Sequence, residues 1–135
     1  MSKRVLVVDD EEVIRKYLRL QLFHWGYEVA DAADGVQALL KLKNERFDLI
    51  ITDIVMPNKD GWALLREVRL DPRTKRIPVI LLTTKNQDSD MFKGYELGAS
   101  YYLPKPFTKE QLQFGIEMMF EETSEEKSIK ANPSN

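Results

Sequence analysis

The chain has 135 residues, of which 43% are hydrophobic and 31% are charged, and its formal net charge is −2. A chain of this length forms a single hydrophobic core, and the composition is that of an ordinary soluble globular protein. The small negative charge gives no electrostatic reason to expect direct binding to nucleic acid. The absence of cysteine excludes disulfides and thiolate metal sites, and it agrees with a reducing compartment.

The two ends of the chain are expected to lie outside any membrane. The first residues, MSKRVLVVDD, contain an apolar run too short for a signal peptide or a membrane span. We therefore expect no membrane insertion and a cytoplasmic location. Residues 122–135 are almost entirely polar and bury too little apolar surface to order themselves. We expect a domain over residues 1–121 and a disordered tail or linker stub over residues 122–135.

Five short apolar segments are predicted to be strands, each followed by a segment with helical spacing. The predicted strands span residues 4–9, 27–31, 48–53, 78–83 and 101–104. Three of them are nearly continuous in Val, Ile and Leu, which is typical of strands buried on both faces of a parallel sheet.

Apolar residues at helical spacing predict amphipathic helices between these strands. The expected buried positions are Val13, Ile14, Tyr17, Leu18, Leu22, Trp25, Val36, Leu39, Leu40, Leu64, Leu65, Val68, Leu112, Ile116 and Met119. Helix N-caps are expected at Asp34, Asp60, Asp88 and Thr108. The helix over residues 88–97 is expected to be the least stable, because Gly94 lies inside it.

The alternation of strands and helices predicts an α/β fold. Parallel crossovers are almost always right-handed, so five short β/α units form an open sheet with helices on both faces. This is the doubly wound, five-stranded, flavodoxin-like architecture. In such sheets, ligands bind outside the carboxyl ends of the strands.

Polar residues follow several of the predicted strands. Asp9 and Asp10 follow the first strand, Asp53 and Thr83 end the third and fourth, and Lys105 follows the fifth. Singly, most have ordinary structural roles, because acids are favoured before a helix and Thr is common at a strand end. Asp53 has no such role, because Asp60 stands at the next helix cap. The convergence of these groups at one edge of the sheet favours a functional site.

Three carboxylates at one edge repel one another unless a cation compensates them. Carboxylate oxygens suit Mg²⁺, or Mn²⁺, and Mg²⁺ also binds phosphate oxygens. The pattern therefore favours a divalent-metal site that receives a phosphoryl group. Asp53 would be a carboxylate nucleophile, while Thr83 and Lys105 would hold phosphoryl oxygens.

The sequence resembles the receiver domain of bacterial two-component response regulators over residues 3–121. The resemblance rests on four motifs in combination. VLVVDDEE holds the acidic pair, DLIITDIVMPNKDG the acceptor strand and its loop, PVILLTT the threonine strand, and GASYYLPKPF the lysine loop. The resemblance, and not the spacing, implies the strand order 2-1-3-4-5 of the chemotaxis response regulator.

Residue by residue, the resemblance implies that Asp53 is the phosphoacceptor. The implied metal ligands are Asp9, Asp10, Asp53 and the backbone carbonyl of Val55. Thr83 and Lys105 would contact phosphoryl oxygens, and a cis peptide is implied between Lys105 and Pro106. Phosphorylation adds negative charge, and Thr83 and Tyr102 are the implied switch residues. The face made by the fourth helix, fifth strand and fifth helix would then change shape. Taken alone, Tyr102 is more simply an amphipathic ring at the edge of a sheet.

The implied function is a phosphoacceptor switch and not a turnover enzyme. The phosphoryl group would come from a histidine kinase or phosphotransfer protein, and the switch would act on a protein target or output domain. We expect a monomer or a weak phosphorylation-dependent dimer. The segments GASYYL and QLQFGIEMMFEE lack the charged pairs through which the main DNA-binding subgroup dimerises.

Three alternatives belong to other classes of protein. A degenerate receiver would act only as an interaction scaffold. A haloacid-dehalogenase-like phosphatase would need a second acid two residues after the nucleophile, where this chain has Val55. A flavin-binding relative of the same fold would need a phosphate loop rich in glycine and hydroxyl groups in place of DDEE.

Overall fold

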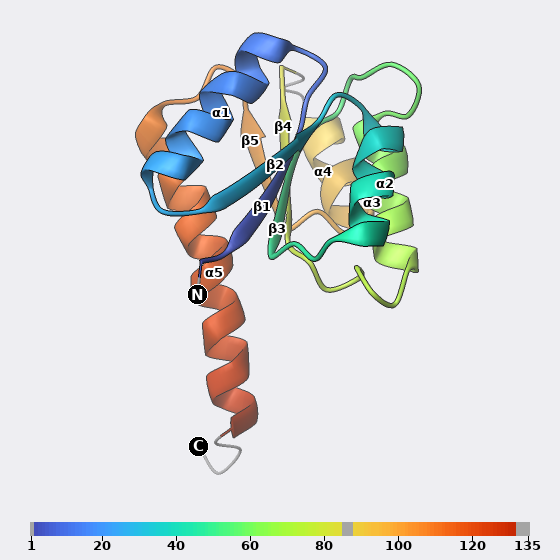
Figure 1. The fold of residues 1–135 in the computed structure, drawn as a ribbon. Coiled ribbons are helices and arrows are strands. Elements are labelled where there is room, and N and C mark those ends of the chain that lie inside the picture. The colour runs from blue at the N-terminus through green and yellow to red at the C-terminus, as the bar shows by residue number, and fades with distance from the viewer. Residues whose placement is uncertain (1, 85–87, 132–135) are drawn as a thin grey trace.

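A parallel sheet lies between two layers of helices in the computed structural model (Figure 1). The structure describes residues 2–84 and 88–131, and for residues 88–90 and 122–131 it describes the backbone alone. The strands are β1 (Arg4–Val8), β2 (Glu28–Ala32), β3 (Leu49–Asp53), β4 (Val79–Thr83) and β5 (Tyr101–Pro104). The helices are α1 (Glu12–His24), α2 (Gly35–Asn44), α3 (Gly61–Leu70), α4 (Asp88–Glu96) and α5 (Lys109–Ala131).

The strand order is β2-β1-β3-β4-β5, and every pair of neighbouring strands is parallel. Helices α1 and α5 cover one face of the sheet, and α2, α3 and α4 cover the other (Figure 1). The predicted fold class and strand order are confirmed. None of the described helices is both long and apolar enough to cross a membrane.

Alternate residues of each strand face opposite helical layers, as the pleat of a strand requires. In β1, Val5 and Val7 pack in the core on the α1 and α5 side, while Leu6 and Val8 pack on the α2 and α3 side. Strands β3 and β4 are buried along their whole length. Their apolar runs therefore fill two cores at once, as the sequence predicted.

Helical periodicity located the buried faces of α3 and α5 correctly but failed in part for α1 and α2. The predicted residues that are buried are Leu18, Leu22, Leu64, Leu65, Val68, Leu112, Ile116 and Met119. The prediction was wrong for Val13, which is 78% exposed, and for Tyr17, Val36 and Leu40, which are also exposed. In α2 the buried positions are Gly35, Ala38 and Leu42. Both helices carry apolar residues on more than one side, so periodicity alone could not select the inner one.

Helix starts follow the predicted caps. Asp34 and Asp60 each accept a hydrogen bond from the backbone N–H three residues later, at 2.9 Å. Thr108 Oγ1 accepts from the Gln111 N–H at 3.0 Å, and Gln111 Oε1 accepts from the Thr108 N–H at 2.9 Å, which is a capping box. The side chain of Asp88 lies outside the described residues. The low stability of the helix around Gly94 stays a prediction.

Helix α5 continues to Ala131, beyond the expected end of the domain at residue 121, and projects past the sheet (Figure 1). The backbone of residues 122–131 is therefore helical, and the expectation that the tail is disordered stays a prediction. This stretch contains no Gly or Pro and is rich in Glu and Lys, which favour helix. A helix pairs its own backbone groups, so it needs no core to do so. Residues 132–135 lie outside the described residues, and the domain limit stays a prediction.

Arg69 ties α3 to the amino-terminal end of β4 and to the turn before β5. Its guanidinium donates to the carbonyls of Ile77 at 2.6 Å, Gly98 at 2.8 Å and Lys75 at 3.1 Å. We expect Arg69→Ala to lower the free energy of unfolding by about 3 kcal/mol, because these carbonyls lose their donor. Urea denaturation measures the change. Arg66→Ala, in the same helix but exposed, is the control, and an equal loss there would contradict this role of Arg69.

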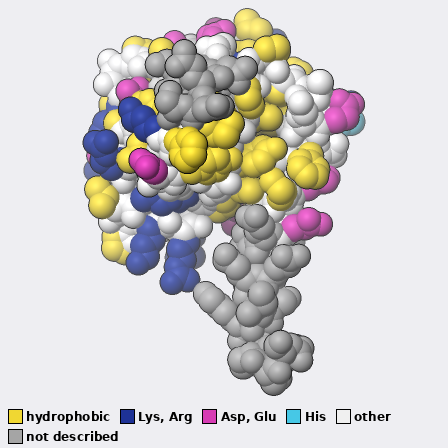
Figure 2. Space-filling view, turned by 180° about the vertical axis from the view of Figure 1, so that it is seen from behind, with side chains coloured by type: hydrophobic (Ala, Val, Ile, Leu, Met, Phe, Trp, Pro, Cys, Tyr) yellow, Lys and Arg dark blue, Asp and Glu magenta, His cyan; other side chains and the backbone are white. Residues whose placement is uncertain are grey.

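The surface seen from behind separates apolar from basic side chains (Figure 2). Apolar side chains gather in this view (Figure 2). Helices α4 and α5 carry the exposed apolar residues Met91, Phe92, Tyr95 and Phe114. Lys and Arg side chains gather at the lower left (Figure 2). The segments that precede β3 and β4 hold the exposed cations Lys43, Arg46, Arg73, Lys75 and Arg76. The side of the domain where β3 and β4 begin is therefore basic.

Candidate functional site

Asp53 is the last residue of β3, and only 6% of it is exposed. Its position is fixed by pairing with Leu82 of β4. Leu49 and Ile51 face the α1 and α5 side of the sheet. Asp53, two residues after Ile51, continues on that side. A buried central strand thus holds this carboxylate at the carboxyl edge of the sheet.

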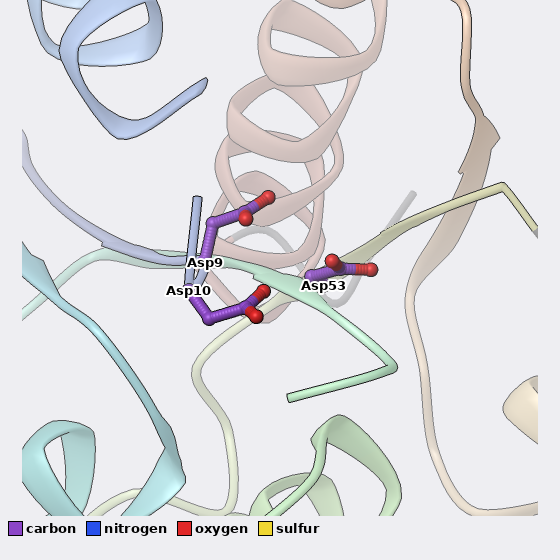
Figure 3. A group of neighbouring side chains, drawn as sticks. All are labelled: Asp9, Asp10 and Asp53. Atoms are coloured by element: carbon purple, nitrogen blue, oxygen red, sulfur yellow. The ribbon is translucent and has the colours of Figure 1, made fainter. Parts of the chain in front are cut away.

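Asp9 directly follows β1 and is fully buried. Its Oδ1 accepts a hydrogen bond from the Glu11 N–H at 2.9 Å, and its Oδ2 accepts from Lys105 Nζ at 3.0 Å. Asp10, the next residue, is exposed. Figure 3 shows Asp9, Asp10 and Asp53 grouped at the ends of their neighbouring strands. One carboxylate oxygen from each lies within 4.8 Å of the other two, so the predicted acidic trio is brought together.

Lys105 reaches the same cluster from the loop after β5. Its Nζ lies 3.0 Å from Asp9 Oδ2 and 3.4 Å from Asp53 Oδ2. The peptide between Lys105 and Pro106 is cis, as the resemblance implied. Burial alone would lower the pKa of Lys105, but the hydrogen bond to Asp9 and the charge of Asp53 raise it above its ordinary value. The ammonium group therefore stays charged between the two carboxylates.

The electrostatics of the cluster fit a divalent cation. Burial raises the pKa of Asp53; the charge of Lys105 opposes this rise, and the charge of Asp9 adds to it. Three carboxylates and one ammonium give the cluster a formal excess of two negative charges. Closely spaced carboxylate oxygens with this excess are the donor set that Mg²⁺ or Mn²⁺ prefers.

The raised pKa of Asp53 predicts a pH-dependent effect on stability. Because this pKa is higher in the folded state, ionisation of Asp53 opposes folding, and the penalty appears as the pH rises through the raised pKa. We expect Asp53→Asn to raise the free energy of unfolding at pH 7 in metal-free buffer. The gain should vanish below the ordinary pKa of an aspartate. Urea denaturation at both pH values measures it, and a gain that is the same at both would point to packing.

Thr83 and Tyr102 lie on the opposite face of the sheet from Asp53. Thr83 ends β4 and is fully buried. Because Val79 and Leu81 face the α2 to α4 side, Thr83 faces that side too. Tyr102 pairs with Leu81 in the register of β4 and β5 and packs in the core on the same side. Tyr102 is buried although β5 is an edge strand, and the two switch candidates are diagonal neighbours on adjacent strands.

Sequence reasoning missed one contact beside the site. Asn58, in the loop after β3, donates from Nδ2 to Asp34 Oδ2 at 2.7 Å, and its backbone φ is +65°. Asp34 was given only a capping role. The available signal was the asparagine of MPNKDG, because asparagine tolerates the left-handed region better than most residues. Val55, in the same loop, has an exposed side chain, and the role of its carbonyl stays a prediction.

Comparison with known proteins places this arrangement in a family. A protein-family model described as "Response regulator receiver domain" matches residues 5–117. The chain is 39% identical over 112 residues to the alkaline phosphatase synthesis transcriptional regulatory protein PhoP of Bacillus subtilis, covering 83% of this chain and 46% of that protein. It is 36% identical over 131 residues to the response regulator MprA of Mycobacterium bovis, covering 97% and 56%. The chain thus spans about half the length of these curated relatives.

Solved structures agree with this assignment. The chemotaxis response regulator CheY4 of Vibrio cholerae is 37% identical, with a TM-score of 0.84 over 88% of this chain and 99% of that one. The receiver domain of the sensor histidine kinase PA1611 of Pseudomonas aeruginosa, solved with a magnesium ion in its active site cleft, is 31% identical. Its TM-score is 0.81, over 88% of this chain and 98% of that one. The chain belongs to the response regulator receiver domain family.

Proposed function

We propose that this chain is a phosphoacceptor switch in which Asp53 takes a phosphoryl group from a histidine kinase or phosphotransfer protein. The observation that supports this most strongly is the position of Lys105 Nζ between Asp9 and Asp53, at 3.0 and 3.4 Å, in an acidic pocket at the carboxyl edge of the sheet. Phosphoryl transfer depends mainly on positioning and charge neutralisation. The pocket offers a fixed carboxylate nucleophile beside a charged ammonium.

In the proposed transfer, a carboxylate oxygen of Asp53 attacks the phosphorus of a phosphohistidine. The bond from phosphorus to the imidazole nitrogen breaks, and that nitrogen keeps the electron pair. The Ile54 N–H, which donates to Asp53 Oδ1 at 2.7 Å, fixes the rotation of the carboxylate. Lys105 then pairs with one phosphoryl oxygen, and the Thr83 hydroxyl donates to another. Mg²⁺ or Mn²⁺ held by Asp9, Asp10, Asp53 and the Val55 carbonyl would neutralise the charge of the phosphoryl oxygens.

The output of the proposed switch is the face formed by α4, β5 and α5. Phosphorylation adds about −1.5 to −2 charges at Asp53. The hydroxyl of Thr83 moves toward this charge, and the packing around Tyr102, its neighbour on the same face of the sheet, changes with it. The apolar surface over α4 and α5 then meets a protein target or an output domain. We propose this action for a cytoplasmic monomer or weak phosphorylation-dependent dimer without direct nucleic-acid binding.

Two other classes of protein have less support. A degenerate receiver acting only as a scaffold would be expected to lack part of the cluster, whereas here Lys105 contacts both Asp9 and Asp53. A turnover phosphatase would need a second acid two residues after Asp53, where Val55 presents an exposed apolar side chain. Both observations favour a phosphoacceptor.

Intact-mass analysis after incubation with acetyl phosphate and Mg²⁺ tests the proposed function. We expect the parent chain to gain one labile phosphoryl group, and Asp53→Ala to gain none. Asp48→Ala, which removes an exposed acid before β3, is the matched control and should be modified like the parent. A parent that stays unmodified, or an Asp53→Ala variant that is modified, would overturn the proposal.

A further inference from the structure

The loop between β3 and α3, residues 54–60, is anchored to a part of the chain that takes no part in the proposed chemistry. Asn58 Nδ2 donates to Asp34 Oδ2 at 2.7 Å, across 24 positions of sequence. Next to this bond, the Gly35 N–H donates to the Lys59 carbonyl at 3.0 Å. The start of α2 therefore holds the loop that follows Asp53 by one side-chain and one backbone hydrogen bond.

The geometry on both sides of this contact is restrictive. Asn58 has a φ of +65°, a left-handed conformation that few side chains other than asparagine adopt without strain. A Cβ on Gly35 would lie 2.7 Å from the Lys59 carbonyl oxygen, so only glycine permits the close approach. Asp34 is almost fully buried, and its Oδ1 also caps α2. Hydrogen bonds from the Gln37 N–H and the Asn58 amide hold the pKa of Asp34 below its ordinary value, so it remains an ionised acceptor.

The anchored loop contains the backbone position that the metal site requires. Val55, whose carbonyl is a proposed ligand, lies two residues after Asp53 and three before Asn58. Within the loop, the Lys59 N–H donates to the Pro57 carbonyl at 2.7 Å, and the Gly61 N–H donates to the Ile54 carbonyl at 2.8 Å. Groups that orient a metal ligand without touching the metal influence affinity strongly.

We infer that Asp34 and Asn58 form a latch that positions the β3–α3 loop for binding of the divalent metal. Both are positioning residues, because they act through the loop and not on the phosphoryl group. The inference rests on the proposed function, since the metal site is part of it. Without the latch, the loop keeps its own hydrogen bonds and its link to Gly35, so the fold persists while the position of the Val55 carbonyl is less well defined.

Two substitutions remove the latch and leave other features in place. Asn58→Gly removes the amide at a position where glycine adopts φ of +65° without strain. Asp34→Ser keeps a hydroxyl that can cap α2 but leaves no second acceptor for Asn58. Asn44→Gly is the matched control, because it also deletes a side-chain amide, one that donates to the Leu40 carbonyl at the far end of α2.

The Mg²⁺ dissociation constant, measured by isothermal titration calorimetry, is the main readout. We expect Asn58→Gly and Asp34→Ser each to weaken Mg²⁺ binding about tenfold. The double variant should bind no more weakly than the weaker single one, because both remove the same contact. Phosphorylation by acetyl phosphate should be slow at low Mg²⁺ and return to within about twofold of the parent rate at saturating Mg²⁺. Asn44→Gly should bind Mg²⁺ like the parent.

Urea denaturation of the same variants separates positioning from a purely structural role. The inference would be overturned if the folded latch variants bound Mg²⁺ as tightly as the parent and only lost stability, as Asn44→Gly does. Should one latch variant fail to fold, the other carries the test. A parent chain that is not phosphorylated on Asp53 would overturn the proposed function itself, whereas a phosphorylated parent with unaffected latch variants would overturn the latch alone.

Discussion

Gly61→Ala is expected to slow the phosphorylation of Asp53 by acetyl phosphate about 100-fold, even at saturating Mg²⁺, because small displacements of a reacting group have effects of this size. A Cβ on Gly61 would overlap the carbonyl oxygen of Asp53 and lie 2.8 Å from the Cα of Ile54. Both are backbone atoms, so the end of β3 has to move. The free energy of unfolding should fall by about 3 kcal/mol.

Gly26→Ala is the control for this substitution. Gly26 has a φ of +93°, and a Cβ there would meet no atom within 4 Å. Alanine is strained at this φ, so the variant should lose about 1 kcal/mol of stability. Because Gly26 lies in the turn between α1 and β2, away from the site, its phosphorylation rate should match that of the parent. Equal phosphorylation rates in the parent and Gly61→Ala would contradict the prediction, because they would show that Asp53 reacts as fast after the end of β3 has moved.

Lys105→Met is expected to slow phosphorylation by about 100-fold or more while tightening Mg²⁺ binding. The ammonium lies within 3.4 Å of two carboxylates and would neutralise a phosphoryl oxygen during transfer. Removing one such charge from a fixed site typically lowers a rate by this factor. The same change leaves three carboxylates uncompensated, which favours a divalent cation. Single-turnover kinetics and metal titration measure the two opposite effects.

Lys43→Met is the control for this substitution. It also removes a lysine charge, but from an exposed position in the last turn of α2. Both its phosphorylation rate and its Mg²⁺ affinity should match those of the parent. Weaker metal binding in Lys105→Met would contradict the electrostatic role of Lys105 and would indicate that its side chain holds the pocket open.

The fold followed from the sequence wherever one kind of signal was sufficient. The runs DLIITD and PVILLT have the continuous apolar character of strands buried on both faces, and β3 and β4 are buried throughout. The caps at Asp34, Asp60 and Thr108 were predicted from residue type and confirmed by hydrogen bonds. Parallel pairing puts the ends of β1 and β3 side by side at one edge, so Asp9, Asp10 and Asp53 lie close together.

Other features depend on which parts of the chain meet in space, and local sequence patterns do not reveal this. The exposure of Val13 is decided by which side of α1 meets the sheet, and apolar residues occur on several sides of that helix. Local pattern assigned Asp34 to capping, but its second oxygen binds Asn58 in a loop that is remote in sequence.

The exposed cations at the amino ends of β3 and β4 have a consequence for how this domain meets other molecules. The acidic cluster lies at the carboxyl ends of the same parallel sheet, so opposite charges occupy opposite poles of the molecule. This separation of charge gives the domain an electric dipole, which its net charge of −2 does not reveal. The field of a charged neighbour orients such a domain before contact. The rate of association therefore depends on ionic strength, because salt screens this orienting field.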